Sequence, residues 1–246
     1  MEQPLTGQVA IVTGAGSGLG EATSRVLAAA GATVIAVDID DENAERVTQD
    51  ICSRRGQAVS YGADVRNWDE VQALCDLIVT DCGRIDILVN NAAVDHTVAV
   101  DGMSVAQWDQ VIGVNLRGPF LCSKAVLPAM KRQRRGHIVN VASTAAKRAW
   151  AQAAAYHASK WGLIGFTRGL GVEGRPYNIK ASVIVPGGMR THFFDRFQGT
   201  SIPMPDPEKL QEPAAVAELI VFVVSRPDSS VVQEAIMTPL LETSWP

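Results

Sequence analysis

The chain has 246 residues, of which 47% are hydrophobic and 20% charged. This length and composition predict one globular domain with a substantial core, spanning residues 1–246. The formal net charge of -4 and the isoelectric point of about 5.6 argue against nucleic acid or an anionic membrane as a partner.

The sequence has no pattern typical of a signal peptide, a membrane span or a metal site. The N-terminus Met1–Pro4 is polar and acidic, unlike a signal peptide, and the apolar run Leu219–Val224 is too short to span a bilayer. The four cysteines form no Cys-x-x-Cys pair and the four histidines are scattered, so reduced thiols and no metal site are expected. These features predict a cytoplasmic protein.

The N-terminal region is typical of a strand, glycine loop, helix and second strand. A buried strand is expected at 8–13, the loop at 14–20, a helix at 21–30 and a strand at 33–37, followed by Asp38. Glycines let the backbone approach a pyrophosphate, and the N-terminus of the next helix offers free N–H groups and a positive dipole end. Asp38 can accept both hydroxyls of an adenosine ribose and would repel a 2′-phosphate. The unit therefore predicts dinucleotide binding.

Two acidic residues follow strand ends in this half of the chain. A helix cap is the alternative role for Asp38, but Asp40 and Asp41 are better placed to cap a helix at 42–55. After a third strand at 57–61, Asp64 can accept from an adenine amino group. The sequence 67–70 is typical of a capping box that opens a helix through Thr80, and a fourth strand at 86–89 ends in the small polar run 90–93.

A long helix is expected from about 108 to 134, preceded by a short helix capped by Ser104. Pro119 falls inside it and removes the N–H that would bond the carbonyl of Asn115, so a kink is predicted. One interpretation is that the freed carbonyl holds a water that relays protons from Lys160. A kink without chemistry is the alternative.

The stretch 153–171 carries the candidate proton donor. Tyr156 and Lys160 are four residues apart, so in a helix they share a face, one turn apart. A tyrosine pKa near ~10 is lowered by a neighbouring cation, which lets the phenol move a proton at ordinary pH. The strand before this helix ends at Ser143, whose hydroxyl can face the pair. Tyr-x-x-x-Lys is common by chance, so an ordinary surface helix is the alternative.

The C-terminal part continues the alternation. A sixth strand is expected at 179–185, an apolar flap at about 192–212, a helix from 213 to about 224 and a weak strand at 235–239. At least six strands alternating with helices predict an α/β, Rossmann-like fold: a doubly wound parallel sheet in a single domain, with helices on both faces. Ligands then bind at the carboxyl ends of the strands.

These motifs together resemble the short-chain dehydrogenase/reductase family over about residues 5–225. The family's Thr-Gly-x-x-x-Gly-x-Gly corresponds to 13–20, its Asn-Asn-Ala-Gly to 90–93, with Ala93 in place of the last glycine, and its Pro-Gly-x-x-x-Thr to 186–191. The positions matching the family's catalytic residues are Asn115, Ser143, Tyr156 and Lys160.

The resemblance implies a role for each catalytic residue. Tyr156 acts as general acid/base, Ser143 holds the substrate oxygen, Lys160 binds the nicotinamide ribose and lowers the tyrosine pKa, and Asn115 supports a relay water. A hydride passes between the nicotinamide and the substrate carbon, and Asp38 without a cation in the glycine loop favours NAD(H). The implied cofactor contacts are Gly14, Ser17, Gly18, Leu19, Gly20, Asp38, Ile39, Asp64, Val65, Asn91, Ala92, Ala93, Tyr156, Lys160, Pro186, Gly187 and Thr191.

The substrate pocket is placed by topology alone. The flap phenylalanines suggest an apolar or ring-containing substrate. Lys147, Arg148 and Arg190 are interpreted as solvated loop cations, with recognition of an acidic group as the alternative. The expected pocket residues are Val94, His96, Trp150, His192 and Phe193.

The sequence thus predicts an NAD-dependent oxidoreductase for a secondary alcohol or ketone. Family members assemble as homotetramers or homodimers through the helices that carry Asn115 and Tyr156, and the tail 236–246 departs from the family pattern. A 3-oxoacyl-thioester reductase is the nearest enzymatic alternative, disfavoured by Asp38 because such reductases take NADPH. A catalytically silent dinucleotide-binding regulatory protein is the alternative from another class.

Overall fold

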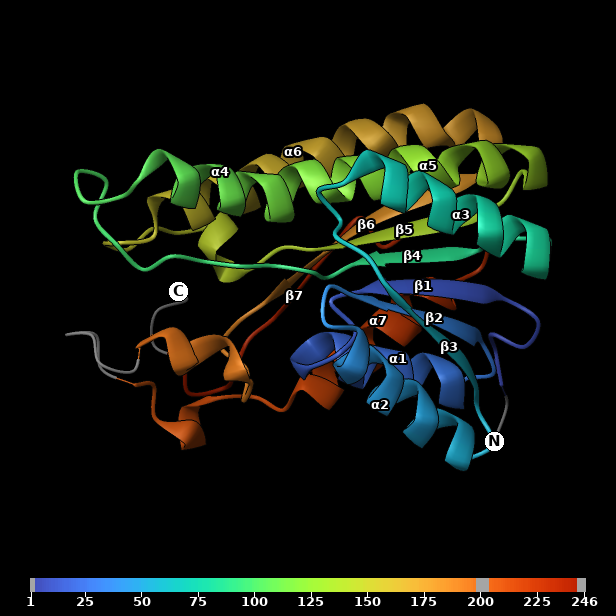
Figure 1. Ribbon diagram of the computed structural model, residues 1–246, viewed down its shortest axis with the longest axis horizontal. Helices are drawn as coiled ribbons and strands as arrows, with labels where there is room; N and C mark the ends of the chain where they lie inside the picture. The colour runs from blue at the N-terminus through green and yellow to red at the C-terminus, as the bar shows by residue number, and fades with distance from the viewer. Residues whose placement is uncertain (1–2, 198–203, 243–246) are drawn as a thin grey trace.

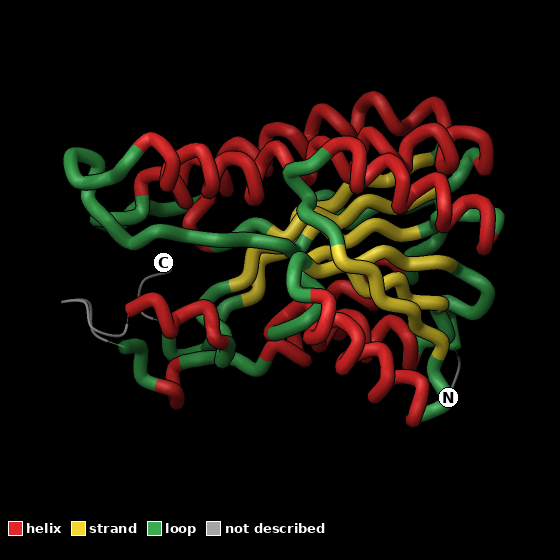
Figure 2. Tube along the Cα trace, in the orientation of Figure 1, coloured by secondary structure: helices red, strands yellow, loops and turns green. Residues whose placement is uncertain are grey.

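A computed structural model describes residues 3–197 and 204–242. Its centre is a seven-stranded sheet, parallel throughout, in the order β3-β2-β1-β4-β5-β6-β7, with helices on both faces (Figures 1 and 2). The predicted doubly wound α/β fold is therefore confirmed. The strands are β1 (Val9–Thr13), β2 (Thr33–Asp38), β3 (Gln57–Gly62), β4 (Ile87–Asn90), β5 (Gly136–Val141), β6 (Ile179–Pro186) and β7 (Glu234–Met237).

Burial along the strands follows their place in the sheet. Every residue of β1, β4 and β5 is buried, because helices cover both faces of a central parallel strand. The edge strand β3 has no fully buried residue. In Figure 1, α1, α2 and α7 cover one face and α3 to α6 the other. The helices are α1 (Gly18–Ala29), α2 (Asp41–Ser53), α3 (Trp68–Cys82), α4 (Val105–Ile112), α5 (Gly118–Gln133), α6 (Ala154–Gly174) and α7 (Pro213–Val224).

Helix α1 begins three residues earlier than predicted, because Gly18 to Gly20 already form its first turn. A Cβ on Gly20 would lie 1.9 Å from the carbonyl oxygen of Gly14, so the loop can fold against the helix only with glycine there. At α2, Asp40 accepts from the backbone N–H of Asn43 at 3.1 Å. This confirms that a residue other than Asp38 caps α2.

The predicted capping box of α3 is only half formed. Asn67 accepts from the backbone N–H of Asp69 at 3.1 Å, as a cap should. Glu70, however, accepts from the side-chain amide of Asn67 at 2.6 Å and from the backbone N–H of Asp64 at 2.9 Å, and not from the backbone N–H of Asn67. The carboxylate thereby ties the start of α3 to the loop after β3.

The long helix is divided by a π-helical turn at Gly113–Arg117, which corrects the prediction of one kinked helix from 108 to 134. Gly118 donates to the carbonyl of Gly113, five residues back. The turn places Pro119 at the start of α5, where its missing N–H costs less than it would in a helix interior. The predicted cap of the preceding helix is confirmed, since Ser104 and Gln107 form a reciprocal capping box at α4.

The C-terminal part supplies the last strand and a returning tail. The weak strand prediction is confirmed by β7, which pairs with β6. The predicted flap contains short 3-10 turns at His192–Phe197 and Pro207–Lys209, and its residues 198–203 lie outside the described chain. In Figure 1 this segment lies at the same end of the sheet as the loop at 94–103.

Further features bear on chemistry and location. All four cysteines are free thiols, and burial raises the pKa of Cys75 and of Cys122 to about 12. Within residues 3–197 and 204–242, no helix has the length and apolarity to cross a bilayer. The same residues contain no cluster of three or more His, Cys, Asp or Glu side chains that could hold a metal ion.

A buried hydrogen-bond chain joins β4, β5 and α6. The amide of Asn90 donates to Asn140 at 2.8 Å, and the amide of Asn140 donates to the hydroxyl of Thr167 at 2.7 Å. Asn90, Asn140 and Thr167 are almost completely inaccessible to solvent. The chain therefore fixes α6 relative to the strands that lead into the site.

We expect Asn140→Ala to lower the free energy of unfolding by ~1–3 kcal/mol, because it leaves the buried amide of Asn90 without this acceptor. Urea denaturation followed by circular dichroism measures the change. Gln49→Ala, on an exposed face of α2, is the control and should change stability by less than about 0.5 kcal/mol. Equal effects of the two substitutions on the free energy of unfolding would contradict a stabilising role for this chain of hydrogen bonds.

Candidate active site

A cavity of about 810 Å³ opens at the carboxyl ends of the strands. Its walls come from the glycine loop, the ends of β2 to β6, the start of α6, the flap and the C-terminal tail. All the predicted catalytic and cofactor residues line it except Gly20 and Asn115. The structure thus brings together residues that are spread over most of the sequence.

The glycine loop is clamped to the end of β4. Gly14 has a φ of +64°, and a Cβ there would lie 2.8 Å from the Cα of Ala92. Asn91 donates its side-chain amide to the carbonyls of Thr13 and Gly14, at 3.0 and 3.1 Å. The hydroxyl of Thr13 accepts from the backbone N–H of Asn91 at 3.1 Å. Asn91 therefore shapes the loop as well as lining the cavity.

The carboxylate of Asp38 is held at the mouth of the same loop. One oxygen accepts from the backbone N–H of Gly16 at 2.8 Å, and the other accepts from that of Asp40 at 3.0 Å. The next residue, Ile39, is 71% exposed and also lines the cavity. An acid followed by an apolar side chain therefore faces the place where an adenosine ribose is expected.

The structure adds a cation that the sequence did not indicate near the loop. Arg46 of α2 donates to the carbonyl of Gly16 at 2.9 Å and to Glu21 at 2.8 Å. Hydrogen bonding from Arg46 is the main cause that lowers the pKa of Glu21. The charge of Arg46 is therefore balanced by a carboxylate of α1.

Asp64 lies in the cavity wall as predicted by topology, but it already has a strong partner. The guanidinium of Arg66 donates to both of its oxygens, at distances down to 2.6 Å, and this hydrogen bonding lowers the pKa of Asp64. A role for Asp64 toward adenine remains a prediction. Val65 lines the cavity beside it.

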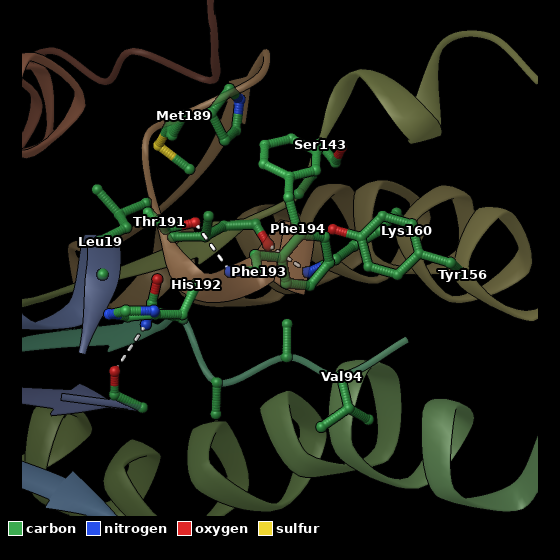
Figure 3. A pocket seen from close by; sticks show the side chains of 18 of the residues that line it. Leu19, Val94, Ser143, Tyr156, Lys160, Met189, Thr191, His192, Phe193 and Phe194 are labelled. Atoms are coloured by element: carbon green, nitrogen blue, oxygen red, sulfur yellow. Dashed lines mark hydrogen bonds between the residues drawn. The ribbon is translucent and has the colours of Figure 1, made fainter. Parts of the chain in front are cut away.

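Ser143, Tyr156 and Lys160 lie together in the wall of the cavity (Figure 3). Ser143 comes two residues after β5, and its oxygen accepts from the backbone N–H of Ala145 at 3.1 Å. Tyr156 and Lys160 are 6% and 2% exposed, and the lysine Nζ lies 5.5 Å from the centre of the tyrosine ring. The predicted shared helix face is therefore confirmed, and the surface-helix alternative is wrong.

The ammonium of Lys160 is buried and bound to a backbone carbonyl. Its Nζ donates to the carbonyl of Val141 at 2.9 Å. Burial lowers the pKa of Lys160 to about 8, while the charge of Asp95 acts in the opposite direction. Asp95, in the loop after β4, was not among the predicted site residues because no motif marks it.

Asn115 is completely buried and does not line the cavity. Its side chain pairs with both the N–H and the carbonyl of Val94, each at 2.8 Å, and donates to Ser159 at 3.1 Å. It therefore joins the loop after β4 to the residue next to Lys160. The relay role of its backbone carbonyl remains a prediction.

The substrate-pocket prediction needs one correction. Val94, Trp150, His192 and Phe193 line the cavity, and the ring of Phe193 is 5.5 Å from that of Tyr156. His96 is not among the described residues that line it. Its Nε2 is 2.8 Å from Gln110, and that glutamine reaches the cavity instead.

Arg148 also departs from expectation. It is not a solvated loop cation but lines the cavity, with a side chain only 22% exposed, and it forms an ion pair with Glu242 of the C-terminal tail. Lys147 and Arg190 do pair outside the cavity, with Glu234 and Glu212. No motif could have indicated Glu242, because the tail departs from the family pattern.

The buried ammonium makes stability depend on pH in a defined direction. The pKa of Lys160 falls from 10.5 to about 8 on folding, so the unfolded chain binds more protons between these values. The free energy of unfolding should rise across this window by about 3 kcal/mol relative to Lys160→Met. Urea titrations of both proteins between pH 7 and pH 11 measure the difference. Parallel pH profiles would contradict a depressed pKa.

Comparison with known proteins agrees with this geometry. The family profile described as short chain dehydrogenase matches residues 8–200. A 3-oxoacyl-[acyl-carrier-protein] reductase, FabG of Thermotoga maritima, is 34% identical over 94% of this chain and 96% of its own. D-threitol dehydrogenase of Mycolicibacterium smegmatis is 39% identical over 74% of this chain and 70% of its own.

Solved structures show the same likeness. The crystal structure of a metagenomic short-chain oxidoreductase in complex with NADP superposes with a TM-score of 0.84 at 34% identity, covering 97% of this chain and 100% of that one. The profile match spans most of the sequence, and the strand order and the cavity agree with it. The chain therefore belongs to the short-chain dehydrogenase/reductase family of oxidoreductases.

Proposed function

We propose that this oxidoreductase transfers a hydride between NAD(H) and a secondary alcohol or ketone, with Tyr156 as the general acid/base. The observation that carries the proposal is the buried Tyr156–Lys160 pair beside Ser143, in one cavity with the glycine loop and Asp38. A nicotinamide dinucleotide suits this cavity, because the glycine loop and the N-terminal turn of α1 line it and can offer backbone N–H groups to a pyrophosphate. When bound, the dinucleotide supplies or accepts the hydride.

The side chains divide the proton chemistry among them. The oxygen of Ser143 accepts from Ala145, so its own O–H remains to donate to the substrate oxygen. Tyr156 gives a proton to that oxygen in reduction and takes one in oxidation. The cation of Lys160 favours the phenolate form of Tyr156. Phe193, packed on Tyr156, keeps water from this end of the cavity.

The preference for NAD(H) rests on charge. The fixed carboxylate of Asp38 repels a 2′-phosphate, and Ile39 offers no cation to compensate. Arg46 is near the loop but is occupied by Glu21. The related metagenomic enzyme was crystallised with NADP, so the preference is a property of these side chains and not of the family.

Fluorescence titration tests the cofactor preference. We expect NADH to bind at least ten times more tightly than NADPH, and Asp38→Asn to shrink that ratio, because the repelling charge is gone. Tyr156→Phe should bind NADH like the wild type while kcat falls by about 10²–10⁴ on any alcohol that the wild type oxidises. Tighter binding of NADPH to the wild type would overturn the assignment of Asp38.

A second candidate is a 3-oxoacyl-thioester reductase, favoured by the similarity to the Thermotoga maritima reductase. Preferential NADPH binding together with reduction of a 3-oxoacyl thioester would support it. Binding of NADH with no turnover by the wild type on either alcohols or thioesters would instead favour a regulatory dinucleotide-binding protein.

We infer assembly through α5 and α6, which lie together on one face of the sheet (Figure 1). Phe120 of α5 is 46% exposed and meets Phe166 of α6 edge-on at 6.3 Å, and Trp161 is 55% exposed. Large apolar side chains gathered on a surface are typical of subunit contacts.

Light scattering tests this assembly. Phe120→Glu combined with Trp161→Glu should convert a dimer or tetramer into smaller species, because charges would be buried in the contact. Val59→Glu, on the edge strand β3, is the control and should leave the molar mass unchanged. A monomeric wild type would refute the inference.

A further inference from the structure

Arg148 has an unusual environment for an arginine in a loop. Arg148 lines the active-site cavity, and its Nη2 is paired with the carboxylate of Glu242. Its Nε is buried and has no hydrogen-bond partner among the described residues. A guanidinium binds a carboxylate best through two parallel N–H groups. The Nε–H of Arg148 is therefore a second donor that could bind a carboxylate together with Nη2. Arg148 is thus a cation in the cavity wall with one N–H donor that is not hydrogen-bonded among the described residues.

The contacts of Glu242 show that the position beside Arg148 can hold a carboxylate. Besides the pair with Arg148, one oxygen accepts from the backbone N–H of Gly188 at 3.3 Å. A Cβ on Gly187 would overlap that carboxylate, so glycine leaves the space it fills. Guanidinium and backbone N–H therefore converge on one anion position, between the loop after β5 and the end of β6. The chain fills that position with its own tail.

The loop that carries Arg148 is held in place independently of the tail. His157 of α6 lies 2.8 Å through Nδ1 from the carbonyl of Ala145, and its Nε2 accepts from the backbone N–H of Trp150 at 3.1 Å. The backbone N–H of Arg148 donates to Thr144 at 3.1 Å. The guanidinium also lies 5.4 Å from the centre of the Trp150 ring. Because His157 adjoins Tyr156, the start of α6 fixes the positions of both Tyr156 and the loop that carries Arg148.

We propose that the substrate of this site is a hydroxy acid or oxo acid, whose carboxylate is bound by Arg148 and displaces the carboxylate of Glu242. This rests on the proposed function, since it names the substrate class of the same cavity. Glu242 is then an internal competitor that neutralises Arg148 until substrate arrives. Phe193 and Phe194, which line the cavity, pack on the apolar part of the substrate, and the carboxylate fixes the orientation of the substrate relative to Ser143 and Tyr156.

Steady-state kinetics with matched substrates test the proposal. The probes are straight-chain 3-hydroxy acids, from 3-hydroxybutyrate to 3-hydroxyoctanoate, and their neutral amides. Arg148→Gln should lower kcat/KM for the acids by roughly 30- to 100-fold, because a charge-assisted fork is lost, and change it for the amides by less than about threefold. Glu242→Gln should lower KM for the acids by roughly three- to tenfold.

Matched controls come from the ion pair outside the cavity. Arg190→Gln and Glu212→Gln remove the partners of an exposed pair at 2.7 Å, and neither should separate acids from amides. Equal losses on acids and amides in Arg148→Gln would overturn the proposal, as would a Glu242→Gln variant that binds acids more weakly. Either result would mean that the ion pair only fastens the tail.

A binding measurement separates this proposal from the proposed function. Butyrate and butyramide cannot react, so their binding to the protein, followed by tryptophan fluorescence, needs no turnover. Butyrate should bind more tightly than butyramide to the wild type, still more tightly to Glu242→Gln, and without preference to Arg148→Gln. If the wild type shows this binding pattern but oxidises no alcohol, the proposed function is wrong and the anion site is supported. If the wild type oxidises alcohols without showing the pattern, the proposed function is supported and the anion site is wrong.

Discussion

The burial of one cation organises the catalytic half of this protein. Lys160 is inside the molecule, and its ammonium has the carbonyl of Val141 and the field of Asp95 in place of water. Removing a charge from water is costly, so the surrounding structure has to hold these groups in place. Asn115 and Ser159 do this on one side, and the hydrogen-bond chain from Asn90 through Asn140 to Thr167 does it on the other. The position of Tyr156 follows from that of the helix they share.

The cofactor half depends on a different constraint, the close approach of backbone to backbone. Gly14 packs on Ala92, and Gly20 packs on Gly14, at distances that leave no room for a Cβ. Asn91 closes the arrangement from the end of β4. The loop is thereby shaped by its own packing, and Asp38, held by Gly16 and Asp40, adds a fixed negative charge at its mouth. The shape of the loop suits a dinucleotide, and in the function proposed above the charge of Asp38 is what distinguishes NAD(H) from NADP(H).

The tail connects the loop after β5 with the end of β6 through hydrogen bonds and an ion pair of Glu242. Glu242 comes from a segment that departs from the family pattern, yet it lies against the end of β6 and neutralises Arg148. A guanidinium left unpaired in a partly closed cavity would be unfavourable, so the tail and the cation stabilise each other while the site is empty of substrate. In the proposal above, Arg148 stabilises the tail while the cavity is empty and binds the substrate carboxylate when it is occupied.

Much of this could be predicted from the sequence, because local rules govern it. Several features depend only on neighbours within a few residues. They are the strands predicted from β-branched runs, the glycine loop, the caps Asp40 and Ser104, and the shared helix face of Tyr156 and Lys160. Parallel pairing then brings the strand ends to one edge, which is why residues far apart in sequence were correctly expected in one cavity. The tertiary structure alone decided four features. These are the π turn before Pro119, the position of His96 outside the cavity lining, the contact of Arg46 with the glycine loop and the pairing of Arg148 with Glu242. Each of these depends on contacts between segments that are distant in the sequence, and packing in three dimensions decides which of those contacts form.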